Sequence, residues 1–131
     1  MKVVKSSRLR VAVAVVIALA LLTPAGAYAL ARVASVRAAI TTHYPRQYTY
    51  ETVTATVKDA GGRPIKGAKV VYTWRYKTTT PRDVRYTNSY GKAYDRRYIS
   101  GATAGYKVVV GVTAYAGGAY KSTSTWFIPH R

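Results

Sequence analysis

Short runs of alternating apolar and polar residues recur along most of this chain, and glycine, proline or Asn-Ser turns separate them. The clearest run covers residues 52–58, where Val53, Ala55 and Val57 alternate with threonines. A period of two is typical of strands that bury one face. No segment after residue 30 shows a sustained period of 3.6 residues. The pattern therefore predicts an all-β, antiparallel β-sandwich of about seven strands.

The other runs define the predicted strands and their inward faces. Strands are expected at 36–40, 70–76, 84–87 (a short edge strand), about 93–99, 106–114 and 120–128. In the last strand the alternation is taken to place Tyr120 and Trp126 inward and Phe127 outward; Tyr76 is also expected to point inward. The predicted core is Val53, Val57, Val70, Tyr72, Trp74, Tyr106, Val108, Val110 and Trp126.

The strand over residues 93–99 has two possible faces. One parity points Ala93, Asp95 and Arg97 inward, and the other points Tyr94, Arg96 and Tyr98 inward. Neither set is apolar, and a buried Asp or Arg is costly unless it is paired. An Asp95–Arg97 pair on one face, or an edge strand with both faces partly wet, would each reconcile the composition. The sequence leaves the register open.

Two motifs specify turns: DAGGRPIKGAKV at 59–70 and TNSYGKA at 87–93. Glycine readily adopts backbone angles that cost other residues free energy, and proline fixes φ and donates no ladder hydrogen bond. A lone Asp before Gly-Gly caps a turn through the neighbouring backbone more often than it binds calcium. Gly117-Gly118 predicts a further hairpin turn. The predicted structural turn residues are Asp59, Gly62, Pro64, Gly67, Asn88 and Gly91.

These two motifs resemble the turns of bacterial immunoglobulin-like domains, of the invasin or adhesin type and of related prealbumin-like modules. The resemblance covers about residues 33–128 and implies an immunoglobulin-like sandwich with a surface or adhesion role. Trp74 stands where such sandwiches often bury a tryptophan, and Tyr106 resembles their tyrosine corner. The fold hosts many unrelated functions, so the resemblance specifies function weakly.

Residues 1–29 read as a signal peptide and residues 30–131 as the domain. Basic residues at the start precede an apolar run at 11–22, and Ala27-Tyr28-Ala29 fits a cleavage site, as does cleavage after Ala27. The run is shorter than the roughly 20 residues that span a bilayer, although an uncleaved anchor is the alternative. We expect a secreted or extracytoplasmic, cell-surface protein. The chain ends directly after the last strand, so covalent attachment to a wall is not expected.

Charge is the strongest compositional bias. The chain has 21 Lys and Arg against 4 Asp and Glu, a net charge of +17, and no cysteine. Four basic residues lie in the predicted leader, so residues 30–131 keep 17 basic residues and a net charge of +13. Solubility alone does not require so few acids, and such a field attracts polyanions. The candidate polyanion-binding residues are Arg75, Lys77, Arg82, Arg85, Arg96 and Arg97.

The expected partner is an anionic cell-wall polymer, a polysaccharide or another envelope polyanion, with a protein partner at the surface as a further possibility. We expect a monomer and no specific nucleic acid. The 13 tyrosines suggest a second hypothesis, a carbohydrate-binding module that stacks sugars on exposed rings. A third hypothesis is an extracellular polyanion or DNA binder.

Catalysis is not expected. With four acids and two histidines the chain has few catalytic groups, and it shows no nucleophile-elbow or zinc-helix motif. His43 and His130 are interpreted as exposed polar residues, and Asp83 and Glu51 are expected to pair with neighbouring arginines. The sequence predicts a protein that is not an enzyme, with no cofactor and no metal site.

Overall fold

The computed structural model describes residues 31–131, and the predicted signal peptide lies outside these residues. The described segment is all-β. Its strands are β1 (Ser35–Ile40), β2 (Tyr50–Lys58), β3 (Lys69–Arg75), β4 (Arg82–Tyr86), β5 (Lys92–Tyr98), β6 (Val108–Ala116) and β7 (Ala119–Phe127).

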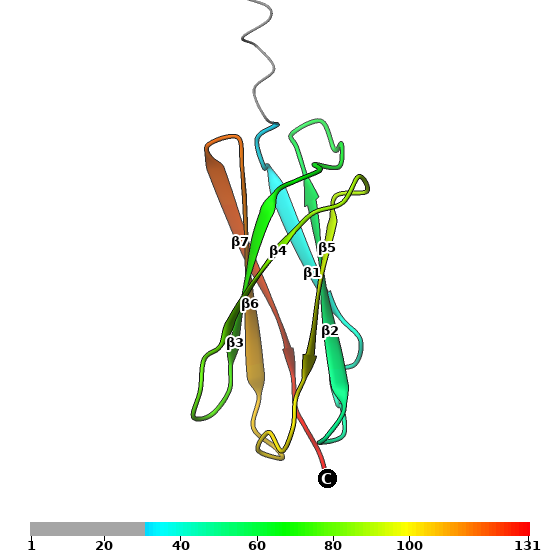
Figure 1. Ribbon diagram of the computed structural model, residues 1–131, viewed down its shortest axis with the longest axis vertical. Coiled ribbons are helices and arrows are strands. Elements are labelled where there is room, and N and C mark those ends of the chain that lie inside the picture. Colours follow the sequence, from blue (N-terminus) through cyan, green and yellow to red (C-terminus); the bar gives the residue numbers. More distant parts are fainter. Residues whose placement is uncertain (1–30) are drawn as a thin grey trace, which may run out of the picture. The chain divides into compact units, whose positions relative to one another are not determined.

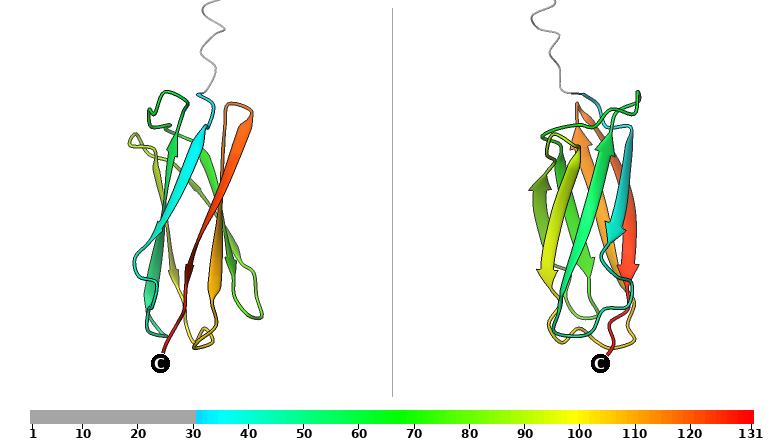
Figure 2. Two further views of the ribbon diagram at one scale, coloured as in Figure 1. Left: turned by 180° about the vertical axis from the view of Figure 1, so that it is seen from behind. Right: turned by 90° about the vertical axis from the view of Figure 1, so that its right-hand side faces the viewer.

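The strands form two antiparallel sheets that pack face to face (Figures 1 and 2). One sheet has the order β1-β2-β5 and the other β4-β3-β6-β7. The right-hand view of Figure 2 faces the three-stranded sheet.

Immunoglobulin constant-type sandwiches keep their fourth strand in the sheet of the first, second and fifth strands. Here β4 pairs with β3 instead. The predicted antiparallel sandwich of seven strands is confirmed, and the sheet to which the fourth strand belongs is what differs from the constant-type arrangement.

The core lies between the sheets and is supplied by the alternating positions of β2, β3 and β6. Val53 and Val57 of β2 and Tyr72 and Trp74 of β3 have no exposed area, and Val70, Val108 and Val110 are equally buried. The Tyr72 hydroxyl donates a hydrogen bond of 2.8 Å to the backbone oxygen of Ala93, which satisfies its one polar group. These seven predicted core positions are therefore confirmed, and Tyr76 packs against the same cluster.

The predicted inward face of the last strand is wrong. The hairpin pairs Val108 with Phe127 and Val110 with Thr125, and residues directly opposite each other share a face. Phe127 is therefore fully buried, while Tyr120 is 67% exposed. Trp126 lies on the outer face, where the His43 ring stacks on it at 4.2 Å between centroids.

Tyr106 is also not a core residue. β6 begins at Val108, and Tyr106 belongs to the preceding loop, where its backbone NH donates to Thr103 after a positive-φ turn at Gly105. The side chain is 38% exposed. The resemblance to a tyrosine corner is thus not realised, because Tyr106 lies in the loop before β6 and its side chain is partly exposed.

The two turn motifs meet at one end of the sandwich, which we call the turn end (residues 59–70 and 87–93; upper end of Figure 1). Backbone hydrogen bonds join the two motifs at Thr87: Gly67 N donates to Thr87 O, and Thr87 N donates to Ala68 O. Gly62, Gly67 and Gly91 all have positive φ. At Gly91 a Cβ would lie 2.6 Å from the oxygen of Val57 and 2.9 Å from Cβ of Pro64. Only glycine fits this contact.

Asp59 and Asn88 cap these turns with their side chains. Asp59 Oδ1 accepts hydrogen bonds of 2.9 Å from the backbone NH of Gly61 and of Arg63. Asn88 Oδ1 accepts in the same way from Tyr90 and Lys92. The backbone hydrogen bond from Arg63, the largest favourable contribution, lowers the pKa of Asp59. The predicted turn residues are confirmed as architecture.

Candidate polyanion-binding surface

The four acidic side chains are all neutralised or withdrawn from the surface. Asp59 pairs with Arg63 at 3.1 Å, Asp95 with Arg85 at 3.1 Å and Asp83 with Arg97 at 2.9 Å. Glu51 is 1% exposed. Three of the 17 basic side chains in the described segment therefore have a carboxylate partner, and 14 do not. The formal charge that remains free on this segment is positive.

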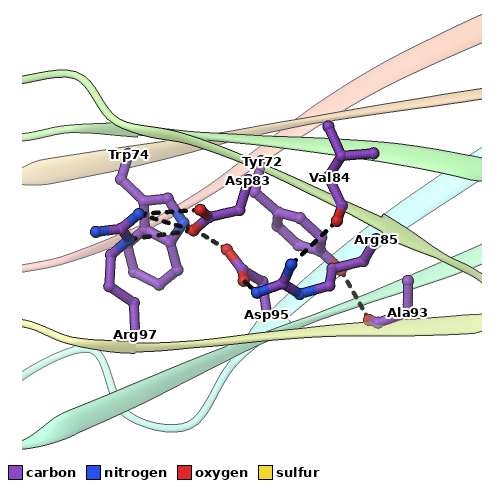
Figure 3. A network of polar contacts seen from close by, with 8 residues as sticks. All are labelled: Tyr72, Trp74, Asp83, Val84, Arg85, Ala93, Asp95 and Arg97. Carbon is purple, nitrogen blue, oxygen red and sulfur yellow. Dashed lines mark hydrogen bonds and ion pairs between the residues drawn. The ribbon is translucent and has the colours of Figure 1, made fainter.

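Two of these pairs form a reciprocal network between β4 and β5 (Figure 3). Each strand carries an acid and an arginine two residues apart, Asp83 and Arg85 on β4 and Asp95 and Arg97 on β5. Asp83 accepts three hydrogen bonds from Nε and Nη2 of Arg97. The two strands belong to different sheets, so the network joins the sheets along one open side of the sandwich.

Asp95 is the most buried member of this network. It has no exposed area, and its Oδ2 accepts a hydrogen bond of 2.8 Å from Nε1 of Trp74. Its Oδ1 faces Arg85 as an ion pair without an aligned hydrogen bond. Burial, together with the neighbouring Asp83 carboxylate, raises the pKa of Asp95 to about 6 despite the opposing effects of Trp74 and Arg85.

The other two carboxylates respond differently to their surroundings. Burial by itself would raise the pKa of Asp83, but the Asp95 carboxyl and the Arg97 guanidinium outweigh it and lower that pKa. Burial raises the pKa of Glu51, whose Oε2 accepts only a long hydrogen bond of 3.3 Å from Thr42 N. The prediction of an arginine partner is thus confirmed for Asp83. For Glu51 it is wrong, because the opposite residue on β5, Arg97, binds Asp83 instead.

The network also resolves the register of residues 93–99. Ala93 and Asp95 are buried and Arg97 is partly buried, while Tyr94, Arg96 and Tyr98 face outward. Asp95 and Arg97 can occupy inward-facing positions because each forms an ion pair with an oppositely charged residue of β4. The Asp95–Arg97 pair considered from the sequence is not formed.

The six candidate polyanion-binding residues do not form one patch. Arg85 and Arg97 stand at inward-facing strand positions and are bound to carboxylates, although the Arg85 side chain is still 48% exposed. Arg75 and Arg82 are exposed on the outer face of the four-stranded sheet, and Lys77 follows in the β3–β4 loop. The Arg75 guanidinium lies over Gly111, where a Cβ would come within 2.7 Å of Nη1. Arg96 is on the outer face of the other sheet.

A group of aromatic residues that the sequence did not single out as one surface surrounds Arg96. Its guanidinium lies 3.9 Å above the ring of Tyr50, and the rings of Tyr50 and Tyr98 are 5.1 Å apart. Tyr94 shares this outer face through its pairing with Thr54. The three tyrosines are about half exposed. Each strand alone shows alternation that points these tyrosines outward. Recognising them as one surface, however, requires knowing that β2 pairs with β5 and in which register.

Two further kinds of feature concern the described residues: clusters of metal-ligand side chains and membrane-spanning helices. Between residues 31 and 131, no three His, Asp or Glu side chains gather as metal ligands would. His43 is held by its ring, since Nδ1 lies 2.7 Å from the backbone oxygen of Trp126. No helix in this part of the chain has the length and hydrophobicity needed to cross a membrane.

No protein-family model and no curated protein sequence matches the chain. The solved structures with a similar fold include the following two. One is the alkylpurine DNA glycosylase AlkC of Pseudomonas fluorescens, bound to DNA containing an abasic site analog, with a TM-score of 0.50 and 16% identity over 77% of this chain and 31% of that chain. The other is the sporulation control protein Spo0M of Bacillus subtilis, with a TM-score of 0.48 and 12% identity over 78% of this chain and 51% of that chain. The chain thus spans about a third and about half of these proteins, and the likeness is one of fold alone.

Proposed function

We propose that this protein is an exported, non-enzymatic immunoglobulin-like module that binds an anionic polymer of the cell envelope and acts in surface adhesion or structural interaction. One observation carries the proposal: every carboxylate side chain is paired or buried, while 14 basic side chains of residues 31–131 have no ion pair. A small domain with this distribution attracts polyanions over its whole surface. The resemblance of the turn motifs to bacterial immunoglobulin-like domains supports the cellular setting.

The contact surface that we propose is the outer side of the β3–β4 hairpin. Arg75, Lys77 and Arg82 are all exposed there, and no carboxylate faces them. Arg85 is excluded because its charge is committed to buried Asp95. Three unpaired cations on one hairpin provide successive contacts for a repeating anionic chain.

Binding of dextran sulfate to the purified protein, with neutral dextran as the matched probe, tests the proposal. The affinity for dextran sulfate should fall about tenfold or more between low and high salt, because charge-driven binding releases counterions and is screened. Replacing Arg75, Lys77 and Arg82 by glutamine should weaken binding further than the matched triple replacement of Arg37, Lys92 and Arg96 on the other sheet. Salt-independent binding would overturn the electrostatic mechanism. Equal effects of the two triple variants would remove the hairpin from the proposal.

A second candidate function, binding of neutral carbohydrate, is favoured by Tyr50, Tyr94 and Tyr98 on one outer face. Sugar rings stack on aromatic faces, and such contacts depend little on ionic strength. Cellohexaose binding that is unchanged by salt and lost in Tyr94→Ala would support this candidate over the first. A lack of cellohexaose binding at any salt concentration would remove it.

A further inference from the structure

The end of the sandwich opposite the turn end contains a hollow of about 460 Å³. We call this region the pocket end (residues 41–49, 76–81 and 99–107; lower end of Figure 1). Its loops contribute Tyr48, Lys77, Thr79, Ser100 and Tyr106 to the lining, and Arg97 of β5 reaches it from the side. The volume is within the range of small-ligand sites.

The wall of this hollow holds an unusual backbone. Tyr48 has a φ of 64° and Ser100 a φ of 50°, and in the described segment no other non-glycine residue has a positive φ. The two residues are joined, since Tyr48 N donates a hydrogen bond of 2.7 Å to Ser100 O. Left-handed conformations cost free energy in side-chain-bearing residues, and such strain is concentrated at binding and catalytic sites. The strained pair positions the Tyr48 ring and the Ser100 side chain at the hollow.

A buried polar group without a partner lies in the same wall. The Tyr76 hydroxyl is inaccessible to solvent and forms no hydrogen bond within residues 31–131. Burial raises the pKa of Tyr76 to about 12, so the hydroxyl keeps its proton and remains available as a donor. Leaving such a group unpaired is unfavourable. A ligand oxygen would remove this penalty only where the side chains that cover the hydroxyl move aside, because the hydroxyl itself is not exposed to the hollow.

The charge of the hollow is positive. Arg97 uses Nε and Nη2 to bind Asp83, and its Nη1 points away from that carboxylate (Figure 3). Lys77 supplies a cation without an ion pair, and no Asp or Glu side chain is part of the lining. Several tyrosine rings and the hydroxyls of Thr79 and Ser100 complete it. Aromatic faces, hydroxyl groups, the unpaired cation of Lys77 and the remaining Nη1 donors of Arg97 together match a hydroxyl-rich ring that carries a negative charge.

We propose that this hollow binds one acidic sugar residue, a uronic acid unit, of the envelope polymer. The inference rests on the proposed function, because Lys77 belongs both to the hairpin surface and to the hollow. A chain that runs along Arg75 and Arg82 would place one residue among Tyr48, Tyr76 and Arg97. The aromatic rings would contact the apolar face of the sugar, and Lys77 together with Nη1 of Arg97 would contact its carboxylate.

The test is a titration of the isotope-labelled purified protein with galacturonate, followed through its backbone amide resonances, with galactose as the neutral probe of the same size. Galacturonate should shift the amides of Lys77, Ser100 and Gly101 saturably, and galactose should bind at least about tenfold more weakly. Tyr76→Phe should raise the Kd for galacturonate about tenfold while the melting temperature stays equal or rises. Lys121→Gln, a change on β7 outside the hollow, should leave the Kd unaltered.

The outcomes separate the two proposals. Absence of saturable shifts at these amides with both galacturonate and glucuronate would overturn the hollow as an acidic-sugar site, even if dextran sulfate binds. Saturable uronate shifts without dextran sulfate binding would leave the hollow in place and overturn the polymer proposal. A Tyr76→Phe variant that is more stable but binds galacturonate unchanged would show that the hydroxyl takes no part in binding.

Discussion

The two ends of this sandwich solve the same geometric problem with different residues. At the turn end the left-handed positions are occupied by Gly62, Gly67 and Gly91, and the polar groups of Asp59 and Asn88 are satisfied by backbone NH groups. At the pocket end Tyr48 and Ser100 adopt such positions, and the Tyr76 hydroxyl has no partner in the described segment.

This difference separates residues that specify the fold from residues that form the candidate binding site. The turn end is locally consistent, because each unusual backbone angle falls on a residue that adopts it at little cost. At the pocket end, by contrast, left-handed backbone angles fall on non-glycine residues, and a buried hydroxyl has no partner in the described segment, all around one hollow. Proteins tend to break local rules at functional sites and to compensate elsewhere in the structure. The contrast therefore directs functional experiments to the pocket end and stability experiments to the turn end.

The largest expected effect is the loss of stability in Gly91→Ala. A Cβ at this position would lie 2.6 Å from the Val57 oxygen, and φ is 72°. Steric conflict with backbone adds to left-handed strain, so we expect a loss of about 3 kcal/mol in the free energy of unfolding. Urea denaturation measures it.

Gly105→Ala at the pocket end is the matched control. Its φ is 81°, but nothing lies within 4 Å of the added Cβ. Only the left-handed strain remains, partly offset by the lower backbone entropy of the unfolded chain, and the expected loss is about 0.5–1 kcal/mol. Equal losses for the two variants would contradict the close packing assigned to the turn end.

Much of the fold was predictable because the signals are local. Alternation in β2, β3 and β6 identified seven core residues, and glycine chemistry identified the turns. The error at Trp126 arose because Trp126 and Phe127 are adjacent and both large, so hydrophobicity does not choose between them. The two-residue Gly117-Gly118 turn determines which of the two side chains points inward. It pairs Ala116 with Ala119 and therefore Val108 with Phe127.

The candidate site was less predictable because exposure depends on contacts between the sheets. The sequence treated Arg85 and Arg97 as surface charges, whereas both are bound to carboxylates. A signal was present, since Asp-x-Arg occurs in two successive strands, at 83–85 and 95–97. Antiparallel strands bearing this pattern oppose each acid to an arginine. That β4 and β5 face each other from different sheets does not follow from either strand alone.

The next largest effect concerns pH and separates the turn end from the charged network. The pKa of Asp95 is raised to about 6, so between its ordinary value and about 6 the folded state binds more protons than the unfolded state. Stability should therefore rise as pH falls from 7 toward 4.5, by a free energy on the order of 2 kcal/mol. Burial raises the pKa of Glu51 and acts in the same direction. Urea denaturation at constant high salt measures this slope.

Asp95→Asn and Asp59→Asn distinguish the two regions. Asp95→Asn should flatten most of the slope between pH 4.5 and 7, because the group with the raised pKa is gone. Asp59 has a lowered pKa, so its contribution is present above the ordinary pKa of an aspartate and is lost only at more acidic pH. Asp59→Asn should leave the slope between pH 4.5 and 7 unchanged. A full slope in Asp95→Asn would contradict the assignment to Asp95.

The smallest expected effects come from a pair of substitutions that exchange glycine and serine between the two ends. This pair tests the comparison of the two ends most directly. Ser100→Gly relieves left-handed strain of about 1–2 kcal/mol but adds backbone entropy to the unfolded chain, about 0.5–1 kcal/mol. The net gain in unfolding free energy should be about 0.5 kcal/mol. Gly67→Ser at the turn end makes the reverse change at a φ of 76° with open space around it. It should lose a similar amount.

Replicate urea titrations of the two variants beside the parent protein resolve such a difference. If Ser100 adopts its conformation only to shape the hollow, Ser100→Gly gains stability while its galacturonate affinity falls, since glycine no longer holds the wall in place. Gly67→Ser should lose stability and keep its affinity. A Ser100→Gly variant that loses stability would show that the serine side chain stabilises the unliganded fold. The strain at the pocket end would then be a structural feature like the glycines at the turn end, and the contrast between the two ends would no longer indicate function.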